Sequence, residues 1–236
     1  MQSPKARMLP QQNGEPFTYC MKLAPSCKLQ AMSRSKSSKR WLQEHHQDSY
    51  VLKAREQGYR SRAVYKLAEI QQKDRIIKPA QLVLDLGAAP GGWSEYAEQI
   101  VGDQGRVIAL DLLSIEPIAG VEFIQGDFTE QQTLDQLLIL IDDRRLDLVL
   151  SDMAPNLSGM GSVDQPRSIY LAELAFDLTR QFLTTDGVFV VKLFQGEGFE
   201  DFISLLRQSF KAVRFRKPDA SRARSSEIYA VCSGLK

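Results

Sequence analysis

Short apolar runs alternate with amphipathic segments from residue 81 to the end of the chain. Runs at 81–85, 106–111, 121–124, 146–151, 187–194, 212–216 and 227–232 have the length and composition typical of buried strands. Helical patterns lie between them. Pro166 can begin the helix that carries Tyr170 to Phe182, and a turn at Asp186–Gly187 follows it. This alternation predicts an α/β protein with a doubly wound, mostly parallel sheet of seven strands and helices on both faces.

The first 80 residues follow a different pattern. Residues 1–32 contain four prolines and no apolar periodicity, so we expect a disordered extension. Residues 33–78 are basic and predict two helices, over 39–56 and 61–73, separated at Gly58. We therefore expect a single domain over residues 33–236, made of this helical part (33–78) and an α/β core (79–236).

Composition excludes several classes of protein. A chain of 236 residues with 43% hydrophobic and 25% charged residues is ordinary for a globular protein. The apolar runs are too short to span a bilayer, and no start resembles a secretory signal. Three cysteines without a CxxC pair argue against a disulfide framework or a zinc cluster, and the adjacent His45 and His46 point to different sides of a predicted helix. We expect a cytoplasmic monomer without a metal ion or a membrane segment.

The net charge of +1 hides a segregation of charge along the chain. Residues 1–80 carry 16 Lys and Arg against 6 Asp and Glu, residues 81–206 carry 6 against 21, and residues 207–236 carry 8 against 2. Either basic end alone could be a solvated surface. Two basic ends around an acidic middle favour a nucleic acid-binding face built from both.

Acidic residues follow several of the predicted strands. Asp85, Asp111, Asp127 and Asp152 each stand at or just after a strand end, where ligands of doubly wound sheets bind. Each alone could serve only as a turn or helix-capping residue. Together they would repel a phosphate but accept a ligand with a ribose, an adenine and a positive centre, as in S-adenosylmethionine.

The glycine-containing loop at 87–92, GAAPGG, narrows the choice of ligand. It matches neither GxGxxG nor GxxxxGK[ST], which weakens the phosphate-binding alternatives. A dinucleotide-dependent dehydrogenase remains the strongest rival, because Asp111 lies 24 residues after Gly87, near the spacing of a ribose-binding acid. The loop alone does not separate the two.

Five segments together resemble the FtsJ family of ribose 2′-O-methyltransferases. They are RSRAVYKLAEIQ (60–71), DLGAAPGGWS (85–94), SDMAPN (151–156), VVKLFQGEGF (190–199) and KPDASRARSSEIYAV (217–231). The resemblance covers most of residues 33–234 and implies a Rossmann-like, class I S-adenosylmethionine-dependent enzyme. Its substrate would be the ribose 2′-hydroxyl of a uridine in large-subunit (23S) ribosomal RNA, within the assembled subunit. The alternative is a non-catalytic RNA-binding ribosome-assembly factor with a residual cofactor pocket.

The resemblance also implies the site residues. The family's S-adenosylmethionine site falls on Gly91, Trp93, Asp111, Asp127 and Asp152. Its catalytic tetrad falls on Lys66, Asp152, Lys192 and Glu227. Trp93 has a packing alternative, because aromatic residues at helix starts mostly belong to the core.

Lys192 stands out from the residues around it. It interrupts the apolar run 188–194, where a lysine is costly to desolvate unless it is paired. A hydroxyl must lose its proton as it attacks a methyl group, and Lys192 is the expected proton acceptor. Burial and Lys66 would favour its neutral amine, whereas Asp152 and Glu227 would favour the ammonium. In an alternative role, Lys192 stays charged and stabilises the developing alkoxide.

Basic residues near the two ends are the expected contacts with RNA phosphates. They are Lys39, Arg40, Arg60, Arg62, Arg214, Arg216, Lys217, Arg222 and Arg224. Tyr65 and Tyr229 could stack on bases, with core packing as the alternative. The 2′-hydroxyl itself distinguishes RNA from DNA.

Overall fold

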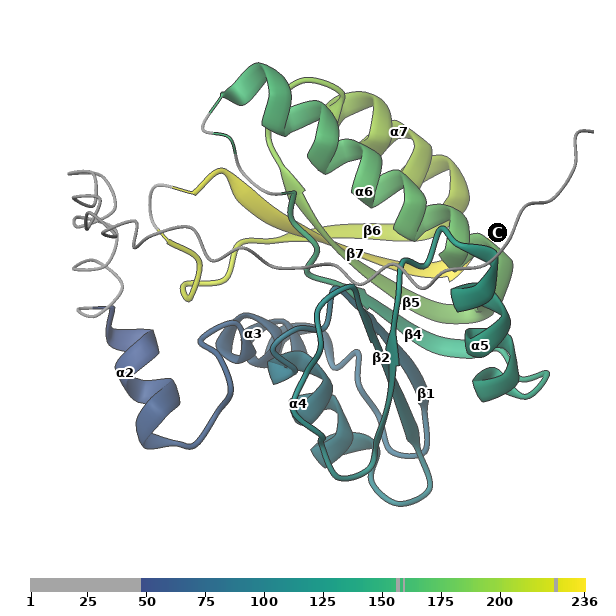
Figure 1. The fold of residues 1–236 in the computed structure, drawn as a ribbon. Coiled ribbons are helices and arrows are strands. Elements are labelled where there is room, and N and C mark those ends of the chain that lie inside the picture. Colours follow the sequence, from purple (N-terminus) through teal and green to yellow (C-terminus); the bar gives the residue numbers. More distant parts are fainter. Residues whose placement is uncertain (1–47, 156–157, 159, 223–224) are drawn as a thin grey trace, which may run out of the picture.

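The computed structural model describes residues 48–155, 158, 160–222 and 225–236 (Figure 1). The strands are β1 (Leu82–Leu86), β2 (Arg106–Asp111), β3 (Val121–Gln125), β4 (Leu146–Ser151), β5 (Leu183–Phe194), β6 (Phe210–Arg216) and β7 (Glu227–Leu235). The helices are α2 (Ser49–Glu56), α3 (Val64–Asp74), α4 (Gly92–Val101), α5 (Gln131–Ile141), α6 (Gly161–Phe182) and α7 (Phe199–Ser209). The predicted disordered extension at 1–32, and His45 and His46, lie outside the described residues.

The seven strands form one sheet in the order β3-β2-β1-β4-β5-β7-β6. Strands β1 to β5 pair in parallel, and β7 runs antiparallel to both β5 and β6. Strands β1, β2 and β3 lie side by side in chain order, and β4 then pairs with the opposite edge of β1. The predicted mostly parallel, seven-stranded sheet is therefore confirmed, and its topological switch point lies between β1 and β4.

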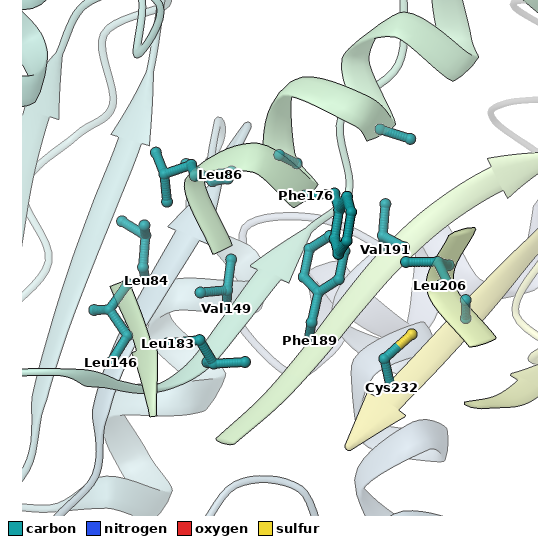
Figure 2. Close-up of a cluster of buried hydrophobic side chains, with 14 of the residues drawn as sticks. Leu84, Leu86, Leu146, Val149, Phe176, Leu183, Phe189, Val191, Leu206 and Cys232 are labelled. Carbon is teal, nitrogen blue, oxygen red and sulfur yellow. The ribbon is translucent and has the colours of Figure 1, made fainter. Parts of the chain in front are cut away.

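The two faces of the sheet bury two separate hydrophobic clusters, because side chains alternate along each strand. On one face, Leu84 of β1 and Phe189 of β5 pack with α5, α6 and α7. Figure 2 shows this cluster, in which Phe176 of α6 lies against Phe189 with ring centroids 6.3 Å apart. On the other face, Val83 and Val190 pack with α3 and α4. Helices thus cover both faces, as predicted (Figure 1).

Several predicted element boundaries are wrong in detail. The helix expected over 39–56 begins at Ser49 in the described part of the chain, because Asp48 has extended backbone and its side chain accepts the N–H of Tyr50. The helix expected from residue 61 begins at Val64.

The boundaries around α6 differ as well. This helix begins at Gly161 rather than at Pro166, which lies inside it. The turn expected at Asp186–Gly187 is instead an irregularity within β5, where the pairing with β4 shifts register between Leu146 and Leu148.

Neither a membrane-spanning helix nor a metal centre is found in the described parts of the molecule. No helix there is long and apolar enough to cross a bilayer. No group of three or more His, Cys, Asp and Glu side chains there could hold a metal ion.

Candidate active site

The carboxyl ends of β1, β2 and β4 lie side by side at one edge of the sheet. They carry Asp85, Asp111 and Asp152. Strands β1 and β4 are parallel neighbours, with Leu86 paired to Ser151, and β2 ends beside β1 at Asp111. Asp85 and Asp152 are close enough to influence each other's ionisation, as are Asp85 and Asp111. The predicted acidic edge therefore exists, and it lies at the switch point.

The glycine-containing loop connects the end of β1 to the start of α4 and lies at this edge of the sheet. Gly87 has φ +72°, and Gly91 has φ +101° as the N-terminal cap of α4. A Cβ atom added at Gly87 would lie 2.5 Å from Met153 Cγ, and one at Gly91 would lie 2.7 Å from Ile118 Cδ1. Both positions thus require glycine for conformation and for space, and the first N–H groups of α4 lie free of intrahelical partners next to the crevice.

Asp111 holds the loop to the end of β2. Its Oδ2 accepts the N–H of Ala89 at 2.8 Å, and its Oδ1 accepts the N–H of Leu113 at 2.8 Å. A carboxylate oxygen can accept more than one hydrogen bond, so Asp111 can still bind ribose hydroxyls. Asp127 follows β3, and its Oδ1 accepts the N–H and the hydroxyl of Thr129 at 2.9 and 2.7 Å.

Asp85 is the most perturbed carboxyl group of the site. Burial raises its pKa to about 7, with further increases from Asp152 and Asp111, although the hydroxyl of Ser94 donates to its Oδ2 at 2.6 Å. Its other oxygen, Oδ1, is buried without a hydrogen-bond partner. Asp85 is therefore mainly protonated below about pH 7, and a bound cation would favour its ionised form.

Trp93 takes the packing alternative. Its indole is 3% exposed, lies in the core beside α3, and donates its Nε1–H to the carbonyl of Ala63 at 2.7 Å. A side-chain contact of Trp93 with a cofactor therefore loses support, and its backbone N–H in the first turn of α4 is the group left for that role.

The four predicted tetrad residues lie together as two ion pairs. Lys192 Nζ lies 3.0 Å from Asp152 Oδ1 and 2.5 Å from the backbone carbonyl of Asp152. Lys66 Nζ lies 2.9 Å from Glu227 Oε1. The lysine that interrupts β5 is thus paired, as its desolvation cost requires, and the two contacts use two of the three ammonium donors.

A fifth residue, Tyr229, joins the two pairs. Its hydroxyl donates to Asp152 Oδ1 at 2.6 Å and accepts from Lys66 Nζ at 3.0 Å. The ring is completely buried, so base stacking by Tyr229 is wrong. The sequence carried a signal for this position, since Tyr229 lies two residues after Glu227 and so faces the same side of β7.

The contacts among these five residues determine the protonation of Asp152 and Tyr229. Although burial alone would raise it, Lys192, Lys66 and the hydroxyl of Tyr229 together keep the pKa of Asp152 below its ordinary value. Burial, Asp152 and Glu227 raise the pKa of Tyr229 well above 10. The edge therefore combines an ionised carboxylate and a neutral phenol with two lysines, and the carboxylate stabilises the positive charge of Lys192.

Several predicted RNA contacts are engaged within the protein. Arg62 forms an ion pair with Asp48 and donates to the carbonyl of Ala220. Arg216 makes two hydrogen bonds of 2.6 Å to Asp74, whose side chain is 2% exposed. A phosphate-binding role for Arg62 and Arg216 therefore loses support.

Arg60 and Lys217 are also held by backbone groups. Arg60 donates to the carbonyls of Glu116 and Pro117, both at 2.9 Å, and ties the segment after β2 beside Gly91. Lys217 donates to the carbonyl of Ser225 at 2.8 Å.

Arg214 and Arg222 keep more of their side chains in solvent. Their side chains are 47% and 36% exposed, although Arg214 lies 3.2 Å from Asp74 and Arg222 lies 4.0 Å from Asp48. They remain predicted phosphate contacts, and Lys39, Arg40 and Arg224 lie outside the described residues.

The segment between β6 and β7 is fixed to α3, which also carries Lys66. The carboxylate of Glu69 accepts the N–H groups of Asp219 and Ala220 at 2.7 and 3.0 Å. Tyr65, on the same helix, is 8% exposed and donates to Gln57 at 2.7 Å, so base stacking by Tyr65 is also wrong. Asp219 and Ala220, which precede Arg222, are therefore held beside the helix that carries Lys66.

Proteins of known family resemble this chain over most of its length. The model of the FtsJ-like methyltransferase family matches residues 59–235. Ribosomal RNA large subunit methyltransferase E of Marinobacter nauticus is 57% identical over 205 residues, covering 87% of this chain and 99% of the relative. The protein of the same name from Hahella chejuensis is also 57% identical over 205 residues, covering 87% of this chain and all of the relative.

A solved structure gives the same result for the fold. The structure of a candidate ribosomal RNA methyltransferase from Plasmodium falciparum superposes with a TM-score of 0.66 at 28% identity, covering 75% of this chain and 98% of that one. Sequence and fold agree, and the chain belongs to the FtsJ-like methyltransferase family.

Proposed function

We propose that this protein transfers a methyl group from S-adenosylmethionine to the ribose 2′-hydroxyl of a uridine in large-subunit ribosomal RNA. The observation that carries the proposal is the buried Lys192–Asp152 pair at the carboxyl edge of the switch point, connected through Tyr229 to Lys66 and Glu227. Relatives that share 57% of the sequence are named large-subunit ribosomal RNA methyltransferases, which supports this substrate.

The residues at the edge fit S-adenosylmethionine better than a phosphate-containing cofactor. Asp85 and Asp152 favour a cationic ligand, Asp111 suits ribose hydroxyls, and Asp127 can accept from an adenine amino group. Gly91, with φ +101° at the start of α4, is proposed to let the backbone approach the methionine part. When bound, the cofactor supplies an electrophilic methyl group on a positively charged sulfur.

The protein's part in the chemistry is to remove a proton and to hold charge. A bound cofactor would give its methyl group to the 2′-oxygen and leave as a neutral thioether, and the attacking hydroxyl must lose its proton. Lys192 first releases one proton of its ammonium to solvent and, as the neutral amine, accepts the hydroxyl proton; the ionised Asp152 stabilises the ammonium that forms again. Lys66, paired with Glu227, adds positive charge near the developing alkoxide.

The RNA is proposed to approach over α3 and the segment between β6 and β7. This segment carries Arg222 and is fixed beside Lys66 by Glu69. The family resemblance implies that the uridine is modified late, in the assembled large subunit.

A labelling experiment tests the proposed substrate. Large subunits from cells that lack the modification are incubated with the protein and methyl-labelled S-adenosylmethionine, beside naked large-subunit transcripts and small subunits. We expect label chiefly in large subunits, on one uridine whose 3′ phosphodiester becomes resistant to alkali. Label on a base, or on small-subunit RNA, would contradict the proposal, and equal labelling of naked transcripts would contradict the preference for assembled subunits.

The same samples separate the alternatives. A non-catalytic assembly factor would bind large subunits without transferring label. A dehydrogenase would bind a nicotinamide dinucleotide in calorimetry, whereas we expect heat of binding from S-adenosylmethionine and none from the dinucleotide.

A further inference from the structure

We propose that Tyr229 is a positioning residue through which Lys66 acts on Asp152. The inference rests on the proposed methyl transfer and assigns a role to a residue outside the tetrad. Its hydroxyl is the link between the two ion pairs, at 2.6 Å from Asp152 Oδ1 and 3.0 Å from Lys66 Nζ. In the part of the chain that the structure describes, no direct ion pair joins Lys66 to Asp152.

The direction of the hydrogen bonds follows from elementary chemistry. An ionised carboxylate only accepts, an ammonium only donates, and a phenol can do both. Tyr229 must therefore donate its hydrogen bond to Asp152 and accept one from Lys66. Lys192 donates to the same oxygen of Asp152. The raised pKa of Tyr229, caused mainly by burial, keeps this phenolic proton in place.

The side chain of Tyr229 is held in place by the residues around it. Tyr229 lies directly opposite Lys192 in the antiparallel pairing of β5 with β7. Its ring is completely buried and packs against Trp93, with centroids 5.7 Å apart. Two charged side chains contact its hydroxyl: Lys66 of α3, which is in turn paired with Glu227 of β7, and Asp152, which follows β4.

This geometry leaves positioning as the role of the hydroxyl. A completely buried ring cannot stack on an RNA base, and a phenol that keeps its proton and directs it at Asp152 cannot accept the substrate's proton. Removal of the hydroxyl leaves Asp152 with one donor fewer and breaks its hydrogen-bonded link to Lys66, whose charge then acts on Asp152 only through space. Asp152 then orients Lys192 less firmly in the transition state, while the cofactor's recognised groups still meet their own residues.

The test is the substitution Tyr229→Phe, which keeps the ring and its packing. We expect a single-turnover rate lower by roughly 10- to 100-fold, the effect of losing hydrogen bonds to charged groups, with little change in KM for RNA or in affinity for S-adenosylmethionine. The matched control is Tyr65→Phe, which removes another buried hydroxyl outside the network and should leave the rate unchanged.

A double-mutant cycle distinguishes coupling from packing. Lys66→Met should lower the rate in the wild-type background and lower it much less in the Tyr229→Phe background. Additive effects, or full activity of Tyr229→Phe, would overturn the proposal. Should Tyr229→Phe not fold, as judged by its melting temperature, the cycle of Lys66→Met with Asp152→Asn still decides, because the proposal requires strong non-additivity and additive effects would refute it.

Failure of this inference is distinguishable from failure of the proposed function. If the proposed function is wrong, the unsubstituted protein transfers no methyl group to large-subunit RNA. If only the role of Tyr229 is wrong, the unsubstituted protein is active and the cycles are additive.

Discussion

Replacement of Asp85 by asparagine should change how the stability of the protein depends on pH. Asp85 ends β1 with a side chain that is 1% exposed, and burial is the main cause that raises its pKa to about 7. Asparagine has nearly the same shape, and its carbonyl can still accept from Ser94, which donates to Asp85 at 2.6 Å. The substitution therefore removes the titration of this site with little change in packing.

The size and sign of the effect follow from linkage. The unfolded chain releases the Asp85 proton near its ordinary pKa of 3.8, whereas the folded protein holds it until about pH 7. Between these values the folded state binds more protons than the unfolded state, so the free energy of unfolding falls as the pH rises. A shift from 3.8 to about 7 corresponds to a total loss of about 4 kcal/mol, at about 1.4 kcal/mol per pH unit. The last part of this loss comes just above pH 7, and none is expected beyond about pH 8.

The assay is urea denaturation of the unsubstituted protein and Asp85→Asn at several values between about pH 5 and pH 8.5. The difference in unfolding free energy should move by about 2 kcal/mol in favour of Asp85→Asn from pH 5 to pH 7, by a few tenths of a kcal/mol more up to about pH 8, and then stay constant. Asp177→Asn, at an exposed position on α6, controls for the change in net charge. A difference that is flat across this range would show that Asp85 ionises freely, and would refute the account of a desolvated acid at the floor of the site.

Three further predictions concern the cofactor, the RNA and the extension. Asp111→Ala should weaken S-adenosylmethionine binding by roughly 10- to 100-fold, with a smaller effect on saturated turnover. The substitution removes the acceptor of the Ala89 and Leu113 N–H groups as well as the ribose contact. Unchanged affinity in calorimetry would contradict this prediction. Arg222→Ala should weaken RNA binding and reduce the slope of log affinity against log salt by about one, and an unchanged slope would remove Arg222 from the interface. A chain that starts at Met32 should keep its melting temperature and its methylation activity, and loss of either would give residues 1–31 a role.

The strands could be predicted because buried parallel strands are continuous apolar runs. Boundaries set by local polar chemistry were harder to place. The start of α6 was missed, because residues before Pro166 are polar and glycine-containing, and the proline resembles a helix start more than a helix interior. The irregularity around Gly187 depends on pairing with β4, which no local pattern shows.

The role of a site residue could be predicted where its own type and sequence surroundings require one function. It could not be predicted where the role depends on a partner that is distant in the sequence. Lys192 could be singled out because a lysine inside an apolar strand needs a partner. The internal role of Arg216 could not, because Asp74, its partner, lies 142 residues earlier in the sequence. The spacing of Tyr229 from Glu227 indicates that both face the same side of β7, but the bridging role of Tyr229 arises only when α3, β4 and β7 meet.

The measurement that tests the central claim most directly compares Lys192→Ala with the unsubstituted protein in calorimetry and in a single-turnover assay. Lys192 contacts Asp152 at the reacting edge, whereas the cofactor's recognised groups are assigned to other residues. We expect the affinity for S-adenosylmethionine to be nearly unchanged and the rate of methyl transfer to large-subunit RNA to fall on the order of 10²–10⁴-fold, the loss expected for a general base. Collapse of cofactor binding with chemistry preserved at saturation would make Lys192 a ligand contact and contradict the account.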